Sequence, residues 1–165
     1  GDTSVHEYPS SKQLSEIAIS SARVVRLFGF DPKVAFVSHS TFGQPLTNRT
    51  KHIKNAVEIL KTMNVDFEFD GDMQPDVALN EEYKDLYPFS KIVGNANILI
   101  MPGQHSAAIS YKMMKTLGDT KVIGPLLIGL GLPIEIAPLR SSTSEILNLA
   151  SIAAYSADVI DYKIS

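Results

Sequence analysis

The sequence contains no cysteine among its 165 residues. This absence excludes disulfide bonds, thiolate metal sites and thiol nucleophiles, and it fits a reducing cytoplasm. Long apolar stretches are also missing, because the longest run, from Val122 to Ile134, is interrupted by glycines and prolines. A membrane helix needs about 18 uninterrupted apolar residues. We therefore expect a cytoplasmic protein that has no membrane partner.

Strong charge of either sign is absent as well. The formal net charge is -3, and no basic block marks a nucleic-acid interface or an anionic-membrane contact. The length fits one domain, or one domain and a fragment. The start, GDTSVHEYPSS, lacks an initiating methionine, a basic region and an apolar core, so it does not resemble a signal peptide. It predicts that residues 1–9 are a linker, or the edge of a segment cut from a longer protein.

The first half of the chain alternates helical and strand patterns. Ser10 and Gln13 have the spacing of a capping box at the start of a helix that ends at Gly29. The order that follows is a strand over Val34–Val37, a helix over about Asn48–Met63, and a strand from Val65 that ends at Asp70-Gly71. In that last strand, apolar and acidic residues alternate, which is typical of one dry face.

The second half continues the alternation. We expect a short helix near Gln74 or Pro75, a buried strand in ANILIMP, and a helix in HSAAISYKMMKTLG. Two further strands are expected in VIGPLLIG and IEIAP. Ser142 and Glu145 then predict a second capping box, and the helix after it should bury Ile146, Leu149, Ala150 and Ala153.

This order of elements predicts a three-layer α/β/α sandwich with a mostly parallel sheet. Ligands of such sheets bind beyond the carboxyl ends of the strands. Three predicted loops lie at such ends: Ser38–Gly43, Asp70–Asp76 and Pro102–Ser106.

The first of these loops combines hydroxyls, an imidazole and a glycine. Side-chain hydroxyls and free backbone N–H groups between a strand and a helix suit an anion such as phosphate. The spacing is not that of a Walker motif, however, and no GxGxxG occurs in the sequence. Serine, threonine and glycine are also simply good loop formers, so an ordinary turn is the alternative interpretation.

Acidic residues gather between positions 66 and 76, but they do not predict a metal site. The first three alternate with apolar residues and so share one strand face, which is usually solvated, and the spacing of a calcium loop is missing. Asp70 is the exception, because an aspartate before a glycine often anchors neighbouring loops. The four histidines have no HExxH spacing. We therefore expect no metal ligands.

Two further positions could meet an anion. Tyr111 and Lys112 follow the loop after the third strand, and Arg140 precedes Ser141 and Ser142 at the start of the last helix. Arginine matches phosphate geometry, and the N-terminus of a helix favours negative charge. A solvent-exposed lysine and a structural arginine are the competing interpretations.

Five stretches together resemble the phosphotransacetylase family, in order and in spacing. They are PKVAFVSHSTFGQP, FEFDGDMQPDVALN, GNANILIMPGQHSAAISYKMMKTLG, VIGPLLIGLGLPIEIAP and SSTSEILNLASIAAY. The loop SHSTFG is nearest to the branch found as the C-terminal domain of bacterial NADP-dependent malic enzymes. The resemblance implies an isocitrate/isopropylmalate dehydrogenase-like fold. It also implies that residues 10–165 are the C-terminal part of a phosphotransacetylase-like domain whose upstream half is absent.

The resemblance also bears on catalysis. The transferases of the family carry a Ser-Arg pair for coenzyme A and acyl phosphate, and a gapless match puts Pro138 and Leu139 at those positions. Arg140 lies one residue later, and the acidic residue of the family falls on Glu145. Because acyl transfer needs a cation where the acyl phosphate is held, this departure argues against turnover.

The function implied is that of a regulatory and oligomerisation domain that binds acetyl-CoA without catalysing transfer. NADP and Mg or Mn would act in another domain of the parent malic enzyme, and this chain would self-associate. The alternatives are an active acyltransferase, which interconverts acetyl-CoA and acetyl phosphate, and a scaffold with a vestigial cleft. The cleft residues expected are Ser38, His39, Ser40, Thr41, Gly43, Tyr111, Lys112, Arg140, Ser141, Ser142 and Glu145, with Asp70 as a structural brace.

Overall fold

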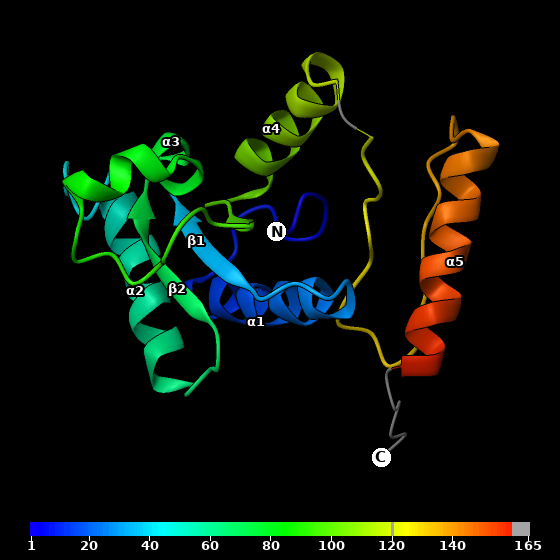
Figure 1. The fold of residues 1–165 in the computed structure, drawn as a ribbon, viewed down its shortest axis with the longest axis horizontal. Coiled ribbons are helices and arrows are strands. Elements are labelled where there is room, and N and C mark those ends of the chain that lie inside the picture. Colours follow the sequence, from blue (N-terminus) through cyan, green and yellow to red (C-terminus); the bar gives the residue numbers. More distant parts are fainter. Residues whose placement is uncertain (120, 160–165) are drawn as a thin grey trace. The chain divides into compact units, whose positions relative to one another are not determined.

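The computed structural model describes residues 1–119 and 121–159. It divides into two compact units, Gly1–Lys112 and Met113–Ser165. Figure 1 shows the elements of both units along the chain. Each unit is described by itself below.

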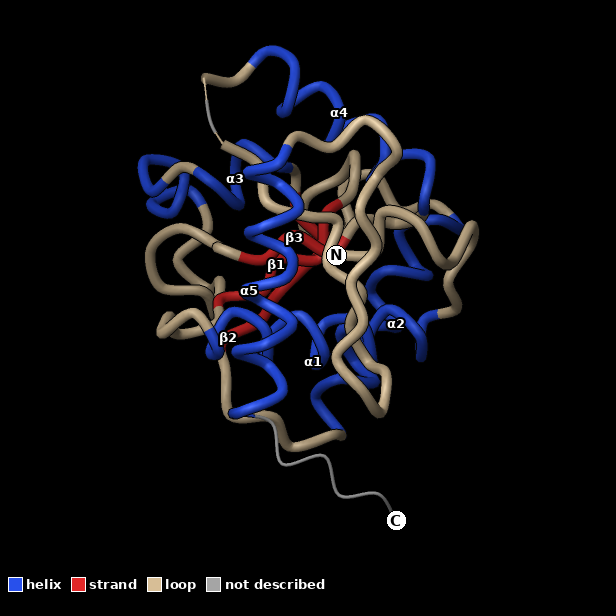
Figure 2. Tube along the Cα trace, turned by 90° about the vertical axis from the view of Figure 1, so that its right-hand side faces the viewer, coloured by secondary structure: helices blue, strands red, loops and turns tan. Residues whose placement is uncertain are grey.

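A parallel three-stranded sheet forms the centre of the first unit. β1 (Lys33–Val37) lies between β2 (Glu68–Met73) and β3 (Ile98–Ile100), and both pairings are parallel. Figure 2 shows the three strands side by side. All but the first residue of β1 are buried, as expected for a central strand that is covered on both faces. The parallel sheet expected from the sequence is confirmed.

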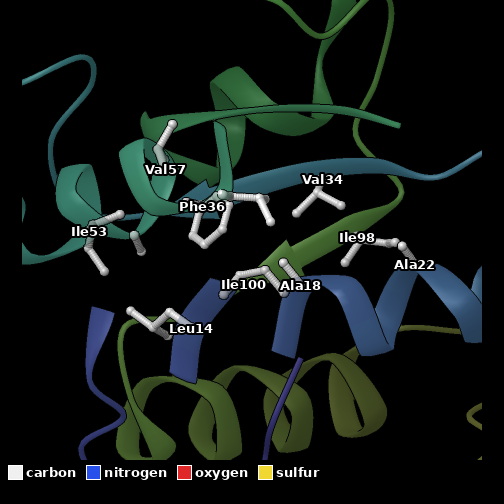
Figure 3. Packing of buried hydrophobic residues seen from close by; sticks show 11 residues of the cluster. Leu14, Ala18, Ala22, Val34, Phe36, Ile53, Val57, Ile98 and Ile100 are labelled. Atoms are coloured by element: carbon white, nitrogen blue, oxygen red, sulfur yellow. The ribbon is translucent and has the colours of Figure 1, made fainter. Parts of the chain in front are cut away.

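Two long helices cover one face of this sheet. α1 (Ser11–Leu27) begins at the expected capping box of Ser10 and Gln13, and α2 (Asn48–Thr62) begins at a second box formed by Thr47 and Thr50. Their buried stripes pack against the strands, as Figure 3 shows. The cluster contains Leu14, Ala18, Ala22, Val34, Phe36, Ile53, Ala56, Val57, Leu60, Ile98 and Ile100.

The opposite face is covered by shorter pieces of chain. α3 (Pro75–Leu79) and the 3₁₀ helix η1 (Glu81–Leu86) follow β2, and the segment up to residue 96 then leads into β3. Ala35 and Met73 pack there against Val77, Ala78, Ile92 and Ala96. Helices or loops therefore lie on both faces of the sheet, which gives the expected three layers.

β2 differs from the expected strand at both ends. It begins at Glu68 rather than Val65, and it continues through Asp70-Gly71 to Met73. Phe36 pairs with Gly71, but Val37 pairs with Met73, so Asp72 is skipped in the register. A Cβ on Gly71 would lie 2.7 Å from both the Cβ and the carbonyl oxygen of Phe36. The glycine therefore permits a close approach of two strands instead of ending one.

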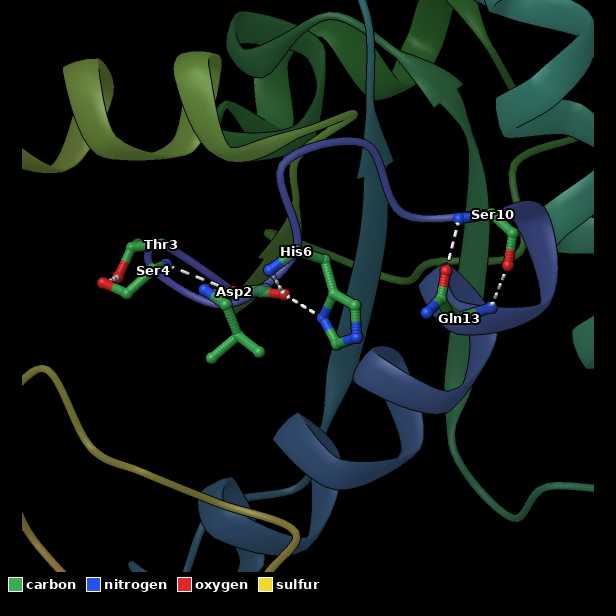
Figure 4. Close-up of polar contacts among 7 residues, drawn as sticks. Asp2, Thr3, Ser4, His6, Ser10 and Gln13 are labelled. Carbon is green, nitrogen blue, oxygen red and sulfur yellow. Dashed lines mark hydrogen bonds and ion pairs between the residues drawn. The ribbon is translucent and has the colours of Figure 1, made fainter.

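Residues 1–9, for which the sequence predicts a linker, make several contacts within the first unit. The carboxylate of Asp2 accepts hydrogen bonds from the backbone N–H groups of Ser4, Val5 and His6, and it lies 2.6 Å from the imidazole of His6. Figure 4 shows this cluster beside the capping box of α1. Further along, the N–H of Gln104 donates to the carbonyl of Glu7 at 3.2 Å.

The second unit contains the end of α4 (Gln104–Leu117) and the whole of α5 (Thr143–Val159). Both helices are where the sequence predicts them. The two strands expected in VIGPLLIG and IEIAP are wrong, because no strand forms within residues 121–142. Extended segments need a partner strand for their backbone groups, and within the described residues these segments have none.

The prediction that α5 buries a stripe of apolar residues is also largely wrong. Leu149 is buried, whereas Ile146 is half exposed, Ala150 is exposed and Ala153 is only partly buried. Among the described residues, no helix is long and apolar enough to cross a membrane.

Candidate functional site

The loop after β1 is shaped by a buried carboxylate that lies on β2. Asp72 is 1% exposed. Its carboxylate accepts a hydrogen bond from the hydroxyl of Ser40, and the backbone N–H of Gly43 donates to it at 3.1 Å. The carbonyl of Asp72 also accepts from the N–H of Phe42. The skipped register at Asp72 thus places this residue beneath the loop.

The other end of the same loop is fixed by the residues that follow Asp72. The N–H of Ser38 donates to the carbonyl of Met73 at 2.9 Å, and the N–H of Gln74 donates to the hydroxyl of Thr41 at 3.3 Å. The side-chain amide of Gln74 donates to the carbonyl of His39. Two segments far apart in the sequence therefore form one hydrogen-bonded corner at the carboxyl ends of β1 and β2.

These internal bonds limit what the loop can offer to a ligand. The hydroxyl of Ser40 and the N–H of Gly43 already donate to Asp72. Within the described part of the chain, the backbone N–H groups of His39 and Ser40 have no protein acceptor, and the side chain of His39 is exposed. Adjacent backbone N–H groups can hold an anion without a charged side chain. The donors left for an anion therefore include these two amides and the imidazole of His39, and also the hydroxyls of Ser38 and Thr41, which only accept hydrogen bonds in this loop.

Asp70 anchors a different segment. Its carboxylate accepts from the N–H of Lys91 at 2.8 Å, and the carboxylate of Glu68 accepts from the N–H of Val93, also at 2.8 Å. The prediction of a solvated acidic face is therefore wrong for Glu68, because the segment around Ile92 covers it, whereas Asp70 anchors a neighbouring segment, as expected of the exception. Asp70 braces this segment, while Asp72 braces the Ser38–Gly43 loop.

The start of α5 forms a second polar cluster, in the other unit. The N–H and hydroxyl of Ser142 donate to the carboxylate of Glu145, and the N–H of Glu145 donates back to the hydroxyl of Ser142. This is the expected capping box. The ammonium of Lys115 on α4 lies 3.1 Å from the same carboxylate.

These contacts stabilise the charged form of Glu145. The N–H of Ser142, then Lys115, then the hydroxyl of Ser142 lower the pKa of Glu145 from 4.5 to about 2. A carboxylate with so low a pKa is a poor proton acceptor near neutral pH. Its position here fits a helix cap and an ion-pair partner better than a general base.

A small pocket lies against this cluster. It encloses only about 10 Å³, which is about the room of one water molecule. Apolar side chains share its wall with the hydroxyl of Ser141, the carboxylate of Glu145 and the amide of Asn148. The lining residues are Val122, Ile123, Gly124, Pro138, Ser141, Glu145, Asn148 and Leu149.

The remaining expected site residues divide between the two units. The Ser38–Gly43 loop, Tyr111 and Lys112 belong to the first unit, and Arg140 belongs to the second with Ser141, Ser142 and Glu145. Lys112 and Arg140 are exposed, and Tyr111 is partly buried. Among the described residues, no group of three or more His, Asp or Glu side chains could hold a metal ion.

The sequence patterns do not indicate three residues of these clusters: Asp72, Gln74 and Lys115. Asp72 continues the acidic alternation, so the pattern places it on a solvated face. The sequence indicates only that a helix begins near Gln74. Lys115 lies 30 positions before Glu145, so no local pattern pairs the two. The inward position of Asp72 could have been predicted only from Gly71, because a glycine inside a strand pattern indicates a bulge.

Comparison with known proteins identifies the family to which these features belong. Residues 1–154 match the family described as phosphate acetyl/butaryl transferase. The NADP-dependent malic enzyme of Rhizobium meliloti is 47% identical over 156 residues, which are 94% of this chain and 20% of that protein. The phosphate acetyltransferase of Clostridium acetobutylicum is 36% identical, over 94% of this chain and 47% of that protein.

Solved structures agree with these matches. A phosphotransacetylase from Streptococcus pyogenes superposes with a TM-score of 0.91 at 34% identity, over 96% of this chain and 48% of that one. EutD phosphotransacetylase from Staphylococcus aureus superposes with a TM-score of 0.89 at 31% identity, over 95% of this chain and 49% of that one. This chain therefore spans about half of the phosphotransacetylases and about a fifth of the malic enzyme. It belongs to the phosphate acetyl/butaryl transferase family and has the phosphotransacetylase fold.

Proposed function

We propose that this chain is the phosphotransacetylase-like part of an NADP-dependent malic enzyme and acts there as a regulatory domain. It binds acetyl-CoA without transferring the acetyl group, and it joins subunits. The parent enzyme oxidatively decarboxylates malate in a separate domain, with NADP and a divalent metal. The observation that carries this proposal is the chemistry at the start of α5, where a transferase needs a cation and a proton acceptor.

The transferase cation is missing from its matching position, and the proton acceptor is already engaged. The resemblance to transferases puts Leu139 at the position of the arginine, and this leucine is fully exposed. Glu145, at the position of the acidic residue, caps α5 and pairs with Lys115. Without a fixed cation, the charge that develops on an acyl phosphate is not stabilised. Without a free base, the thiol of coenzyme A is not activated.

Binding of acetyl-CoA without transfer of its acetyl group requires neither that cation nor a free base. The surface beside α5 combines apolar residues with Ser141 and Asn148, and such residues could contact the amide-bearing aliphatic arm of coenzyme A, although the pocket itself is too small to enclose it. Arg140 is exposed one residue before Ser141 and could pair with a phosphate. In the first unit, the free amides of His39 and Ser40 offer a second anion site.

Regulation follows if acetyl-CoA binds two states of the parent enzyme with different affinities. The test uses a chimera: the R. meliloti malic enzyme with residues 1–165 of this chain in place of its matching segment. We expect acetyl-CoA to bind the chimera in calorimetry and to change its rate of malate-dependent NADP reduction. The variant Arg140→Ala should weaken that binding about tenfold, since a charged hydrogen bond contributes about 1.5 kcal/mol or more. Arg23→Ala, which removes an exposed arginine from α1 in the first unit, serves as the matched control.

No binding heat together with intact subunit assembly would instead indicate a scaffold. An active acyltransferase is the second candidate, and the match to phosphate acetyltransferases favours it. That match covers 94% of this chain at 36% identity. Release of free coenzyme A from acetyl-CoA and phosphate by the chimera would support this candidate and contradict the first.

A further inference from the structure

The segment 7–9 contacts the start of α4, a helix that lies far from it in the sequence. The N–H groups in the first turn of an α-helix have no acceptor within the helix. In α4, the N–H of Gln104 donates instead to the carbonyl of Glu7 at 3.2 Å. The N–H of Ala107 then donates to the carbonyl of Gly103, as in a regular first turn. A carbonyl from a distant segment therefore caps α4.

A glycine lets the two segments approach each other closely. A Cβ on Gly103 would lie 2.9 Å from the carbonyl oxygen of Glu7 and 4.0 Å from the ring of Pro9, which is buried. Gly103 is not among the glycines with positive φ, so its backbone conformation does not require a glycine. The close approach of the segment 7–9 does.

His52 on α2 contacts the same segment. Its Nε2 lies 2.8 Å from the carbonyl oxygen of Pro9, and its Nδ1 lies 3.0 Å from the hydroxyl of Ser11. A carbonyl oxygen only accepts hydrogen bonds, so Nε2 carries a proton and donates it to Pro9. The hydroxyl of Ser11 also lies 2.9 Å from the carbonyl of His52. The imidazole thus contacts the chain just before and just after Ser10, which caps α1.

Few other contacts hold the first turns of α4. Ala107 is the one buried residue of this helix, all of which the structure describes. Helices in proteins are stabilised mainly by the packing of a buried face. A helix that buries a single small side chain therefore depends on the contacts of its first turn. α4 also carries Tyr111 and Lys112, two of the expected cleft residues.

We propose that the segment 7–9 is a strap that positions the start of α4, and that His52 is the latch that holds this strap. His52 is then a positioning residue, because it acts on α4 only through Pro9 and Glu7. The strap and the latch lie within the first unit and do not depend on acetyl-CoA binding. Only the importance of Tyr111 and Lys112 for a ligand rests on the proposed function.

Amide hydrogen exchange in the 165-residue chain, followed residue by residue by NMR, tests the latch. His52→Leu removes both ring contacts and keeps an apolar side chain of similar size. We expect the N–H of Gln104 to exchange at least about tenfold faster, as for the loss of one hydrogen bond. The N–H of Phe36, in the core, reports global stability and should change less. His39→Leu, which replaces an exposed imidazole, is the matched control and should change neither rate.

His52→Gln separates the positioning role from a general loss of packing. The side-chain amide of glutamine can donate to the carbonyl of Pro9, as Nε2 of the imidazole does. We therefore expect most of the protection of the Gln104 N–H to return in His52→Gln. If His52→Gln and His52→Leu accelerate this exchange equally, the hydrogen bond to Pro9 does not hold the strap and the latch is contradicted.

Gly103→Ala tests the strap without changing His52. Its new Cβ would lie 2.9 Å from the carbonyl oxygen of Glu7 and should separate the strap from α4. We expect the same acceleration at the N–H of Gln104. Gly131→Ala is the matched control, because no atom lies within 4 Å of its new Cβ, and it should leave this exchange unchanged.

Four outcomes overturn the inference. Unchanged Gln104 exchange in Gly103→Ala would show that the strap does not cap α4. An effect of Gly103→Ala without an effect of His52→Leu would show that His52 is not the latch. Equal acceleration at Gln104 and Phe36 would indicate a global loss of stability. Failure of His52→Leu to fold would likewise show that His52 supports the whole unit rather than the strap.

Discussion

The hydroxyl of Ser40 donates to the carboxylate of Asp72, and both side chains are out of solvent. This contact joins the loop after β1 to the strand beside it. No basic side chain contacts Asp72 within the described part of the chain. Hydrogen-bond donors of the loop therefore take the place of a counter-ion, as buried carboxylates require.

Asp72→Ala should destabilise the first unit. It removes the carboxylate acceptor of the buried Ser40 hydroxyl and of the partly buried Gly43 N–H, and we expect a loss of about 2–4 kcal/mol in the free energy of unfolding. Urea denaturation measures this loss. Asp85→Ala, which removes an exposed carboxylate from η1, should change stability by less than about 0.5 kcal/mol. Equal effects of the two variants would show that Asp72 does not hold the loop.

Gly71→Ala should lower the stability of the first unit more than an ordinary glycine substitution does. The new Cβ would lie 2.7 Å from the Phe36 carbonyl oxygen, and φ at Gly71 is +153°. We expect a loss of about 2 kcal/mol or more, because strain and overpacking add. Gly29→Ala is the control. Gly29 also has a positive φ, +82°, but no atom lies within 4 Å of its new Cβ, so only the backbone cost of about 1 kcal/mol remains. If thermal melts give equal losses, the close approach of β1 and β2 is not what requires Gly71.

Local sequence patterns predicted the elements whose stability is local. Ser10 with Gln13, and Ser142 with Glu145, mark helix starts because capping involves residues only three apart. The sequence of β1 indicates a strand equally clearly, because a strand that is buried on both faces is continuously apolar.

Contacts between distant segments could not be predicted in the same way. The inward position of Asp72 depends on a skipped register between β1 and β2, and the partner of Glu145 lies on another helix. The strands expected after Lys121 failed for a related reason. Their pattern is correct for strands, but a strand also needs a neighbour, and no local pattern supplies one.

Glu145 should titrate far below an ordinary glutamate. With a pKa of about 2 in the folded protein against 4.5 otherwise, its contribution to stability is present above pH 4.5. It is lost as the pH falls from there through about 2, because the unfolded state then binds the proton first. Carbon-detected NMR titration of the side chain measures the midpoint.

Lys115→Met should raise that midpoint by removing the ammonium beside the carboxylate. Lys12→Met, which breaks an exposed 3.8 Å pair with Glu16 on α1, is the control and should leave the Glu145 titration unchanged. A midpoint near 4.5 in the unmodified chain would mean that Glu145 is free to act as a base, and would weaken the case against turnover.

The most direct test of the central claim, binding of acetyl-CoA without transfer, is release of free coenzyme A from acetyl-CoA and phosphate. The chimera with this chain should release none above background, although it binds acetyl-CoA. Introducing the transferase pair by Pro138→Ser and Leu139→Arg supplies the absent cation and should raise the rate at least about 100-fold above that background. Steady release by the unsubstituted chimera, with no gain from the two substitutions, would contradict the account.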